Sequence, residues 1–302
     1  NIKNYTHEQF QSVYDYPFLS SSANHIYDLS IGFDESSAMS GSVSIVQESK
    51  KINMYNQMSQ VLLGYTGSAN DVRKFELDTT LDGSGIMRES LFINFSRLIT
   101  KDQIKKGTVT VTLGTGSWDA PFALLKTLTD ASASATEGTA NTLGGDYGVL
   151  YDSGNTARGV VFYQAGLIAL STSSFDTMTD FFSNSAGTSS VLDTFVSSSI
   201  TASADAFRHR VQNISFNNTT EINSSIFFCR VPHNKYNHSA NPTYLSASTI
   251  RVKSVNSDQP ISYITTIGLY SSDNELLAVA KLSEPLRKDP TNELTLRVRL
   301  DY

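Results

Sequence analysis

The sequence predicts a mainly β protein with a few short helices, in an antiparallel β-sandwich or Greek-key-like architecture. Its apolar runs are short, and turns rich in Gly, Ser, Asn and Asp separate them, as in antiparallel sheets. Only two or three segments have helical spacing, and no repeat of fixed period is visible. At 302 residues the chain is long enough for one large β domain or two smaller ones.

The N-terminal segment offers two interpretations. About twenty residues carry aromatic side chains without clear periodicity, namely Tyr5, Phe10, Tyr14, Tyr16 and Phe18. They fit an arm that packs onto a neighbouring chain or an ordinary N-terminal segment. Residues 25–33, HIYDLSIGF, then alternate as a strand does. Residues 49–64 predict the longest helix, which ends at Gly64; its apolar positions are Ile52, Tyr55, Met58, Val61 and Leu62.

The next elements are predicted from alternation and capping. Residues 90–99, SLFINFSRLI, predict a strand, and Thr100 to Gln103 have the spacing of a capping box. A short helix is therefore expected to open there and to close at Gly107. Residues 107–114, GTVTVTLG, predict a half-buried strand with Val109, Val111 and Leu113 on one face.

Small polar residues mark a predicted loop and a predicted boundary. Residues 130–146 form a low-complexity loop, YGVLYD and residues 159–172 predict paired strands, and residues 173–182 predict a short helix. Residues 183–205 are again rich in Ser, Ala and Thr, so we place a boundary there. The chain then divides into a mixed, β-rich domain with an N-terminal arm, 1–205, and an antiparallel β domain, 206–302, which could share one core.

The C-terminal domain is predicted to consist of strands in NISF, SSIFFCRV, STIRVKSV, YITTIGLY, ELLAVAKL and LTLRVRLDY. Residues 271–274, Ser-Ser-Asp-Asn, form the turn between YITTIGLY and ELLAVAKL. In the last strand, Leu294, Leu296, Val298 and Leu300 share one face. ISYITTIGLY and ELLAVAKL are apolar on both faces, which indicates burial in a sandwich or against another chain.

Composition narrows the class of protein. The net charge of −6 disfavours a nucleic-acid binder or a protein of anionic membranes. No apolar run approaches the roughly 20 residues of a membrane span. Only 17% of residues are charged, and a surface of hydroxyl and amide groups suits a virion protein or one that faces other subunits.

No motif predicts catalysis, a cofactor or a metal, and we expect none of the three. Gly114-Thr115-Gly116 follows a strand, but no helix with a phosphate-binding lysine comes after it. One set of side chains offers the sulfur, nitrogen and oxygen atoms that zinc accepts as ligands: Cys229, His233 and His238, with Asp258 as a fourth candidate. Strong zinc signatures combine two close pairs of ligands, so Cys229 is interpreted as a small core residue and the histidines as loop residues.

Two further groups have a functional and a structural interpretation. Glycan cleavage requires two carboxylates about 5–10 Å apart, and the candidates are Asp119, Asp130, Asp146, Asp152, Asp176 and Asp180. Basic residues gather at Arg208, His209 and Arg210, and Arg297 and Arg299 share a strand face. In an acidic chain such arginines favour salt bridges to a neighbouring acidic chain over nucleic acid.

The chain resembles virion structural proteins of T4-like, contractile-tailed bacteriophages of marine cyanobacteria. The resemblance spans nearly the whole chain, and it is most specific in YITTIGLYSSDNELLAVAKLSEPLRKDPTNELTLRVRLDY. Other matching segments are YPFLSSSANHIYDLSIGF, KKINMYNQMSQVLLGY, FINFSRLITKDQIKKGTVTVTLGTGS, YGVLY, FYQAGLIAL and NISFNNTTEINSSIFFCR. The IGLY…ELLAVAKL pair is also similar, more weakly, to a strand-turn-strand unit near the start of phage tail fibres.

The resemblance implies a structural component of the tail apparatus, in the baseplate or fibre-attachment region. It implies a homo-oligomer, or a complex with other virion structural proteins, in virions assembled in the host cytoplasm, with no enzyme activity and no site residues. A head, neck or capsid-surface protein of the same virion is the first alternative. A tail protein that binds or degrades a host surface glycan is the second.

Overall fold

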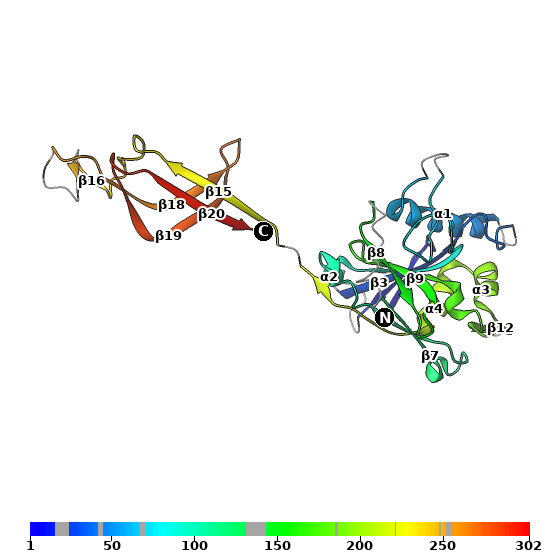
Figure 1. The fold of residues 1–302 in the computed structure, drawn as a ribbon. Helices are drawn as coiled ribbons and strands as arrows, with labels where there is room; N and C mark the ends of the chain where they lie inside the picture. Colours follow the sequence, from blue (N-terminus) through cyan, green and yellow to red (C-terminus); the bar gives the residue numbers. More distant parts are fainter. Residues whose placement is uncertain are drawn as a thin grey trace. The chain divides into compact units, whose positions relative to one another are not determined.

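The computed structural model describes residues 1–15, 24–41, 45–66, 71–130, 143–184, 187–220, 222–247, 249–251, 255 and 257–302. The chain divides into an N-terminal unit, Asn1–Thr220, and a C-terminal unit, Glu221–Tyr302. With 41% strand and 18% helix it is mainly β, and a ten-stranded antiparallel sheet dominates it. The predicted fold class is therefore confirmed, and the arrangement is consistent with a sandwich-like class (Figure 1).

The large sheet belongs to the N-terminal unit and consists of two antiparallel meanders that meet where β4 pairs with β10. Its order is β1-β2-β3-β4-β10-β9-β8-β7-β6-β13. The strands are β1 (Ile2–Asn4), β2 (Gln11–Tyr14), β3 (His25–Phe33), β4 (Glu89–Phe95), β6 (Thr110–Gly114), β7 (Leu125–Thr129), β8 (Tyr147–Tyr151), β9 (Ala157–Phe162), β10 (Leu167–Ser171) and β13 (Val211–Ser215).

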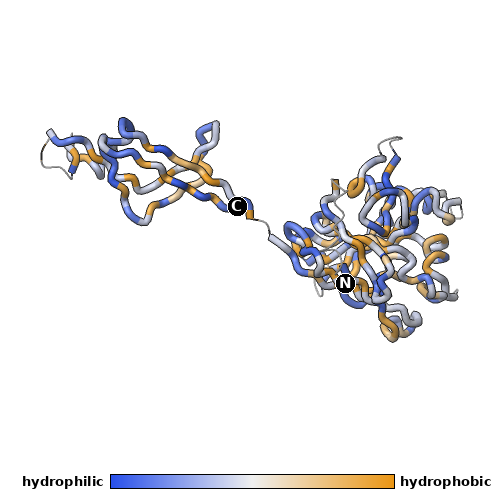
Figure 2. The backbone as a smooth tube through the Cα atoms, viewed as in Figure 1, coloured by the Kyte–Doolittle hydropathy of each residue, from blue (hydrophilic) through white to orange (hydrophobic). Residues whose placement is uncertain are grey.

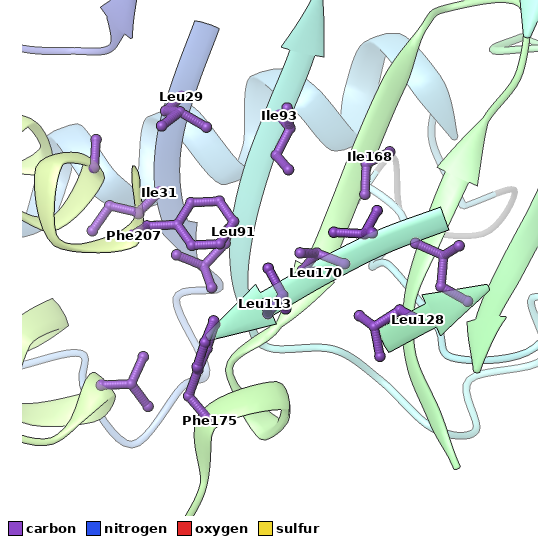
Figure 3. Close-up of a cluster of buried hydrophobic side chains, with 14 of the residues drawn as sticks. Leu29, Ile31, Leu91, Ile93, Leu113, Leu128, Ile168, Leu170, Phe175 and Phe207 are labelled. Carbon is purple, nitrogen blue, oxygen red and sulfur yellow. The ribbon is translucent and has the colours of Figure 1, made fainter. Parts of the chain in front are cut away.

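Both faces of this sheet are buried, because alternate residues of its central strands enter two different clusters. Leu91 and Ile93 of β4 enter the larger cluster, whereas Phe92 between them enters the smaller one. Figure 3 shows that the larger cluster includes Leu29 of β3 and Leu113 of β6, which lie far apart in the order of strands. The sheet therefore curls, and one of its faces encloses the main core.

The helix α1 (Ile45–Leu62) covers the face with the smaller cluster. Gly32 of β3 permits this contact, because a Cβ at this position would lie 2.8 Å from both the Lys51 oxygen and the Tyr55 nitrogen. The predicted helix exists, and Tyr55 and Leu62 are buried. Its predicted apolar face was wrong at one position: Val61 is 72% exposed, while the charged Lys51 is fully buried.

The helix α3 (Val191–Ser197) lies within the segment where a domain boundary was predicted, and α4 (Ile200–Arg210) begins in that segment. Phe195, Ile200 and Phe207 of these helices are fully buried in the larger cluster. The strand β13 then completes the sheet beside β6. The division therefore falls after Thr220 rather than after residue 205, because a stretch rich in small polar residues forms packed helices.

Two other helix predictions differ from the structure. The strand β4 ends at Phe95, and the one-turn helix α2 (Arg97–Thr100) comes before the expected capping box. After it, β5 (Gln103–Ile104) pairs with β14 (Asn218–Thr219), because Ile104 is buried in the larger cluster. In place of a helix over 173–182 there is one 3₁₀ turn, η3 (Thr172–Phe175), and the short hairpin β11 (Phe182–Asn184) and β12 (Gly187–Ser189) follows. A second 3₁₀ turn is η2 (Pro121–Ala123).

The predictions for the N-terminal segment, the loop at residues 130–146 and two strands have different outcomes. The described part of the N-terminal segment pairs as β1 and β2 in the sheet, so residues 1–15 are an ordinary edge and not an arm. Tyr16 and Phe18, and residues 131–142 of the predicted loop, lie outside the described residues. The strand predictions for 25–33 and 107–114 are confirmed, and Val109, Val111 and Leu113 are buried as expected.

The C-terminal unit consists of strands, and its described residues include no helix. Four of the predicted strands are confirmed as β15 (Ser224–Val231), β18 (Ser262–Tyr270), β19 (Leu276–Lys288) and β20 (Leu294–Asp301). From the predicted strand STIRVKSV, only β17 (Thr249–Ile250) is described as a strand, and it pairs with β16 (Leu245–Ser246). The predicted turn around residues 271–274 is present, with Asn274 at φ 63°.

Candidate interaction surface of the C-terminal unit

The C-terminal unit is built from two long antiparallel ribbons. One pairs β15 with β20, and the other pairs β18 with β19. Hydrophobic and hydrophilic residues are interspersed along these strands, as Figure 2 shows. In β20 the alternation predicted for residues 294–300 is confirmed, because Leu294, Leu296, Val298 and Leu300 are buried or half-buried while the residues between them are exposed.

The more apolar faces of the two ribbons form a thin core. Phe227, Cys229 and Val231 of β15 stand opposite Val298, Leu296 and Leu294 of β20. Among the described apolar residues of this unit, only Val231 and Val298 are buried. Every residue of the two large hydrophobic clusters belongs to the N-terminal unit. The C-terminal unit thus lacks the core that usually stabilises a domain of this size.

The opposite faces of the ribbons carry large apolar side chains in contact with solvent. On the first ribbon, Phe228 is 69% exposed and Ile226 is 46% exposed, and they stand opposite Arg297 and Arg299. On the second ribbon the exposed apolar side chains are Tyr263, Tyr270, Leu276, Leu277 and Val279. Exposed apolar surface of this extent on strands is typical of an interface with another chain.

A groove of about 620 Å³ lies between the ribbons. Its lining includes Cys229, Val231, Tyr236, Ile264, Ile267 and Leu296. A buried ammonium group holds the loop after β15: Lys288 donates to the His233 carbonyl at 3.2 Å and to Asn237 Oδ1 at 2.6 Å. The Ser262 hydroxyl donates to the Tyr236 carbonyl. This loop is therefore fixed to the base of both β18 and β19.

The candidate zinc ligands have separate environments. Cys229 is half-buried opposite Leu296, the His233 carbonyl accepts from Lys288, and the His238 ring packs edge-on against Tyr244 at 6.4 Å. In the described part of the chain, a group of carboxylates lies close enough together to share an ion. The candidate zinc ligands Cys229, His233, His238 and Asp258 do not belong to that group.

Most of the aspartates considered for glycan cleavage make structural contacts. Asp130 is fully buried and accepts from the Gly107 and Val109 nitrogens, both at 2.8 Å, and from the Tyr163 hydroxyl at 3.0 Å. The other contacts join Asp152 to Arg158, Asp176 to Arg158, Asp146 to Lys106 and Asp180 to the Trp118 nitrogen. Among the described residues, Asp119 makes no ion pair and no side-chain hydrogen bond.

The two groups of basic residues also differ. Arg210 is fully buried, lies over the Trp118 ring at 5.7 Å, and donates to the carbonyls of Gly116, Asp180 and Phe181. Arg208 pairs with Asp205 at 2.7 Å. In contrast, Arg299 is exposed beside Asp301 and donates to Ser224, and Arg297 lies on the same exposed face.

The sequence interpretation missed one group of carboxylates. Oxygens of Glu76, Asp78 and Asp82 lie within 4.8 Å of one another in a loop of the N-terminal unit. The signal was present as Asp78-x-Thr80-x-Asp82-Gly83, which follows the start of a calcium-loop pattern with Thr at its third position. The substitution of Thr at that position, and the flanking strands in place of helices, conceal the pattern.

Fold and surface together define a mainly β chain of two units with an uncovered apolar surface on the second. No protein-family model matches this chain, and no curated protein or solved structure matches it significantly. Within the described ranges, no helix has the length and apolar character needed to cross a bilayer.

Proposed function

We propose that this chain is a structural component of a tailed-phage virion, in the baseplate or fibre-attachment region of the tail, and that it acts through packing between subunits without catalysis. The assignment to a phage virion rests on the resemblance of the sequence to T4-like virion structural proteins. The observation that carries the mechanical role is the C-terminal unit, whose described apolar residues include only two buried ones.

The surface supports self-association or binding to another virion protein for a physical reason. A small unit without a disulfide or a large core is stable only when something covers its apolar side chains. Its one cysteine is free. Burying side chains such as Phe228 and Leu277 contributes roughly 1.5–3 kcal/mol each, so a few of them can hold an assembly together.

The first prediction concerns the solution mass of the full chain, measured by light scattering after size exclusion. We expect an oligomer, or a complex with purified tail proteins. The double variant Phe228→Ser/Leu277→Ser should lower the association constant at least tenfold. The matched control is Val61→Ser/Leu98→Ser, which removes two side chains of the N-terminal unit that are 72% and 66% exposed and should leave association unchanged.

A monodisperse monomer that binds no virion protein would contradict the proposal. Peptides of this chain in purified heads but not in purified tails would favour the head or neck alternative. Release of reducing sugar from host envelope would instead favour a glycan-degrading tail protein. A low-resolution map of the particle would locate the chain and give its copy number around each symmetry axis.

A further inference from the structure

The strand β18 has one free edge. It pairs with β19 along one side, and within the described residues no backbone hydrogen bond joins its other side to any strand. The groove of about 620 Å³ runs along this free edge, because the consecutive residues 262–268 all line it. A groove against one face of a strand is lined by alternate residues instead. The unpaired backbone groups of β18 are therefore accessible to another strand.

This edge also lacks the residues that usually prevent pairing between edges. Charged residues and proline are the common protection of exposed edges. Over its nine residues, SYITTIGLY, β18 has neither. The other described strands of eight or more residues in the C-terminal unit all have such residues: Arg230 in β15, Lys281 and Pro285 in β19, and Arg297 and Arg299 in β20. Among these strands, β18 is the one best suited to pairing with a strand of another chain.

The pattern of exposure along β18 is symmetric about its middle. Residues 262, 264, 267 and 269 are buried or half-buried, whereas residues 263, 265, 266 and 268 are exposed. A register shift between Ile264 and Thr266 interrupts the alternation there. The Thr265 and Thr266 hydroxyl oxygens consequently lie on one side of the strand, 3.5 Å apart. From the midpoint between these two threonines, β18 presents the same order of exposed and covered residues in both directions.

A strand with this symmetry is complementary to itself. In an antiparallel pair, directly opposite residues lie on the same face of the sheet. When two copies of β18 pair about the midpoint, Thr265 stands opposite Thr266 of the second copy, and Ile264 stands opposite Ile267. Exposed residues thus meet exposed residues, and covered residues meet covered ones, along the whole of 262–269.

The ends of this pairing bring tyrosine rings together. Tyr263 stands opposite Gly268 of the second copy, and within each copy the Tyr270 ring lies over Gly268, since a Cβ there would be 2.9 Å from Tyr270 Cε2. Tyr263 of one copy and Tyr270 of the other therefore meet at each end. In a single copy these rings are 46% and 63% exposed, and tyrosine is enriched at protein interfaces.

A second copy fits this edge better than a strand of unrelated sequence. The edge offers no charge for an ionic partner to recognise. Its symmetric exposure pattern is required for pairing about a twofold axis, whereas pairing with an unrelated strand requires no symmetry. The association also closes at two copies, because each copy uses its one long edge without protection.

We propose that two copies of this chain pair through β18, antiparallel and about a twofold axis between Thr265 and Thr266, in a continuous sheet of order β19-β18-β18-β19. The pairing rests on the proposed function for its role, since it names the contact between subunits that a virion component requires. Ile264 and Ile267 of each copy then face the groove, whose apolar lining includes Val231 and Leu296. The exposed face with Phe228 stays free to bind a different virion protein.

Charge substitutions at the axis test the pairing in the full chain. Thr265→Lys brings like charges of the two copies together across the axis, and Thr266→Glu does the same with the opposite sign. Both threonines are exposed within one copy, so each variant should fold as the wild type does. In sedimentation equilibrium we expect a wild-type dimer, and each variant alone should weaken dimerisation by about tenfold or more.

An equimolar mixture of the two variants tests the register. It sets a lysine opposite a glutamate, so a heterodimer should form with a dissociation constant within about threefold of the wild-type value. Thr295→Lys is the matched control, because it adds the same charge at an exposed position of β20. This control should change dimerisation less than about twofold.

The outcomes separate this pairing from the proposed function. A wild type that stays monomeric would overturn the pairing, although binding of that monomer to purified tail proteins would still support a structural role in the virion. An oligomer that both substitutions leave intact would likewise overturn the pairing and leave the structural role in place. A mixture that forms no heterodimer would show that Thr265 and Thr266 do not face each other, and would overturn the proposal.

Discussion

Lys51 is a charged side chain that the N-terminal unit buries completely. Its ammonium group donates to the carbonyls of Phe195 and Ser198, the latter at 2.7 Å, and so caps the C-terminal end of α3 from the neighbouring helix. Burial lowers the pKa of Lys51 to about 8. The charged form is therefore held in the fold at a cost in unfolding free energy.

Lys51 should make stability depend on pH. Between the folded pKa of about 8 and the unfolded value of 10.5, the unfolded chain binds the proton more tightly, so the free energy of unfolding rises with pH. From about pH 7.5 to about pH 9.5, we expect the wild type to gain about 2 kcal/mol relative to Lys51→Met in urea unfolding. The neighbouring variant Lys50→Met should keep the wild-type slope. Parallel pH profiles for the wild type and Lys51→Met would contradict this assignment.

At the scale of elements, the approach of α1 to β3 depends on the missing side chain of Gly32. The Lys51 oxygen and the Tyr55 nitrogen are backbone atoms, which cannot move aside as a flexible side chain can. The helix packs directly on the strand, and the Tyr55 hydroxyl donates a hydrogen bond to the Met87 carbonyl at 2.8 Å.

Gly32→Ala should therefore destabilise the N-terminal unit by roughly 2–3 kcal/mol, the cost typical of overpacking, measured by urea unfolding. Gly154→Ala is a suitable control, because the nearest atom to its Cβ would be the Asp152 side chain at 3.2 Å in an exposed turn. A loss below about 0.5 kcal/mol at Gly32 would mean that α1 can move away from the sheet without cost.

Strands were easier to predict than helices in this chain. Alternation located β3, β6 and β20, because apolar residues alternate with polar or small ones along each of these strands. The helices α3 and α4 were missed because Ser, Thr and Ala fill the positions between their buried residues. A contact distant in sequence also supports α4: Arg210 at its end donates to the Gly116 carbonyl.

The candidate surface was predicted only in part. Apolar residues on both faces of YITTIGLY and ELLAVAKL indicated burial in a sandwich or against another chain, whereas Tyr270, Leu277 and Val279 are exposed within this chain. The groove could not be predicted, because it depends on which ribbons face each other and on the buried Lys288. The acidic group depends on the hairpin that returns Asp82 toward Glu76.

At the scale of the whole molecule, the two units differ in how they are stabilised. The N-terminal unit contains both hydrophobic clusters, whereas among the described apolar side chains of the C-terminal unit only Val231 and Val298 are buried. Residues 1–220 expressed alone should therefore be folded and monomeric, with the same melting temperature as the N-terminal transition of the full chain. Calorimetry and light scattering on the two proteins check this. A fragment that is unfolded, or that oligomerises as the full chain does, would contradict it.

The C-terminal unit also begins and ends at one place. The Asn223 nitrogen donates to the Tyr302 carbonyl at 2.8 Å, and the Tyr302 nitrogen donates back to the Asn223 carbonyl at 2.8 Å. A module whose two ends meet can be inserted into a surface loop of an unrelated protein without forcing that loop open. Residues 222–302 are thus suited to transplantation into such a loop together with a partner that covers their apolar side chains.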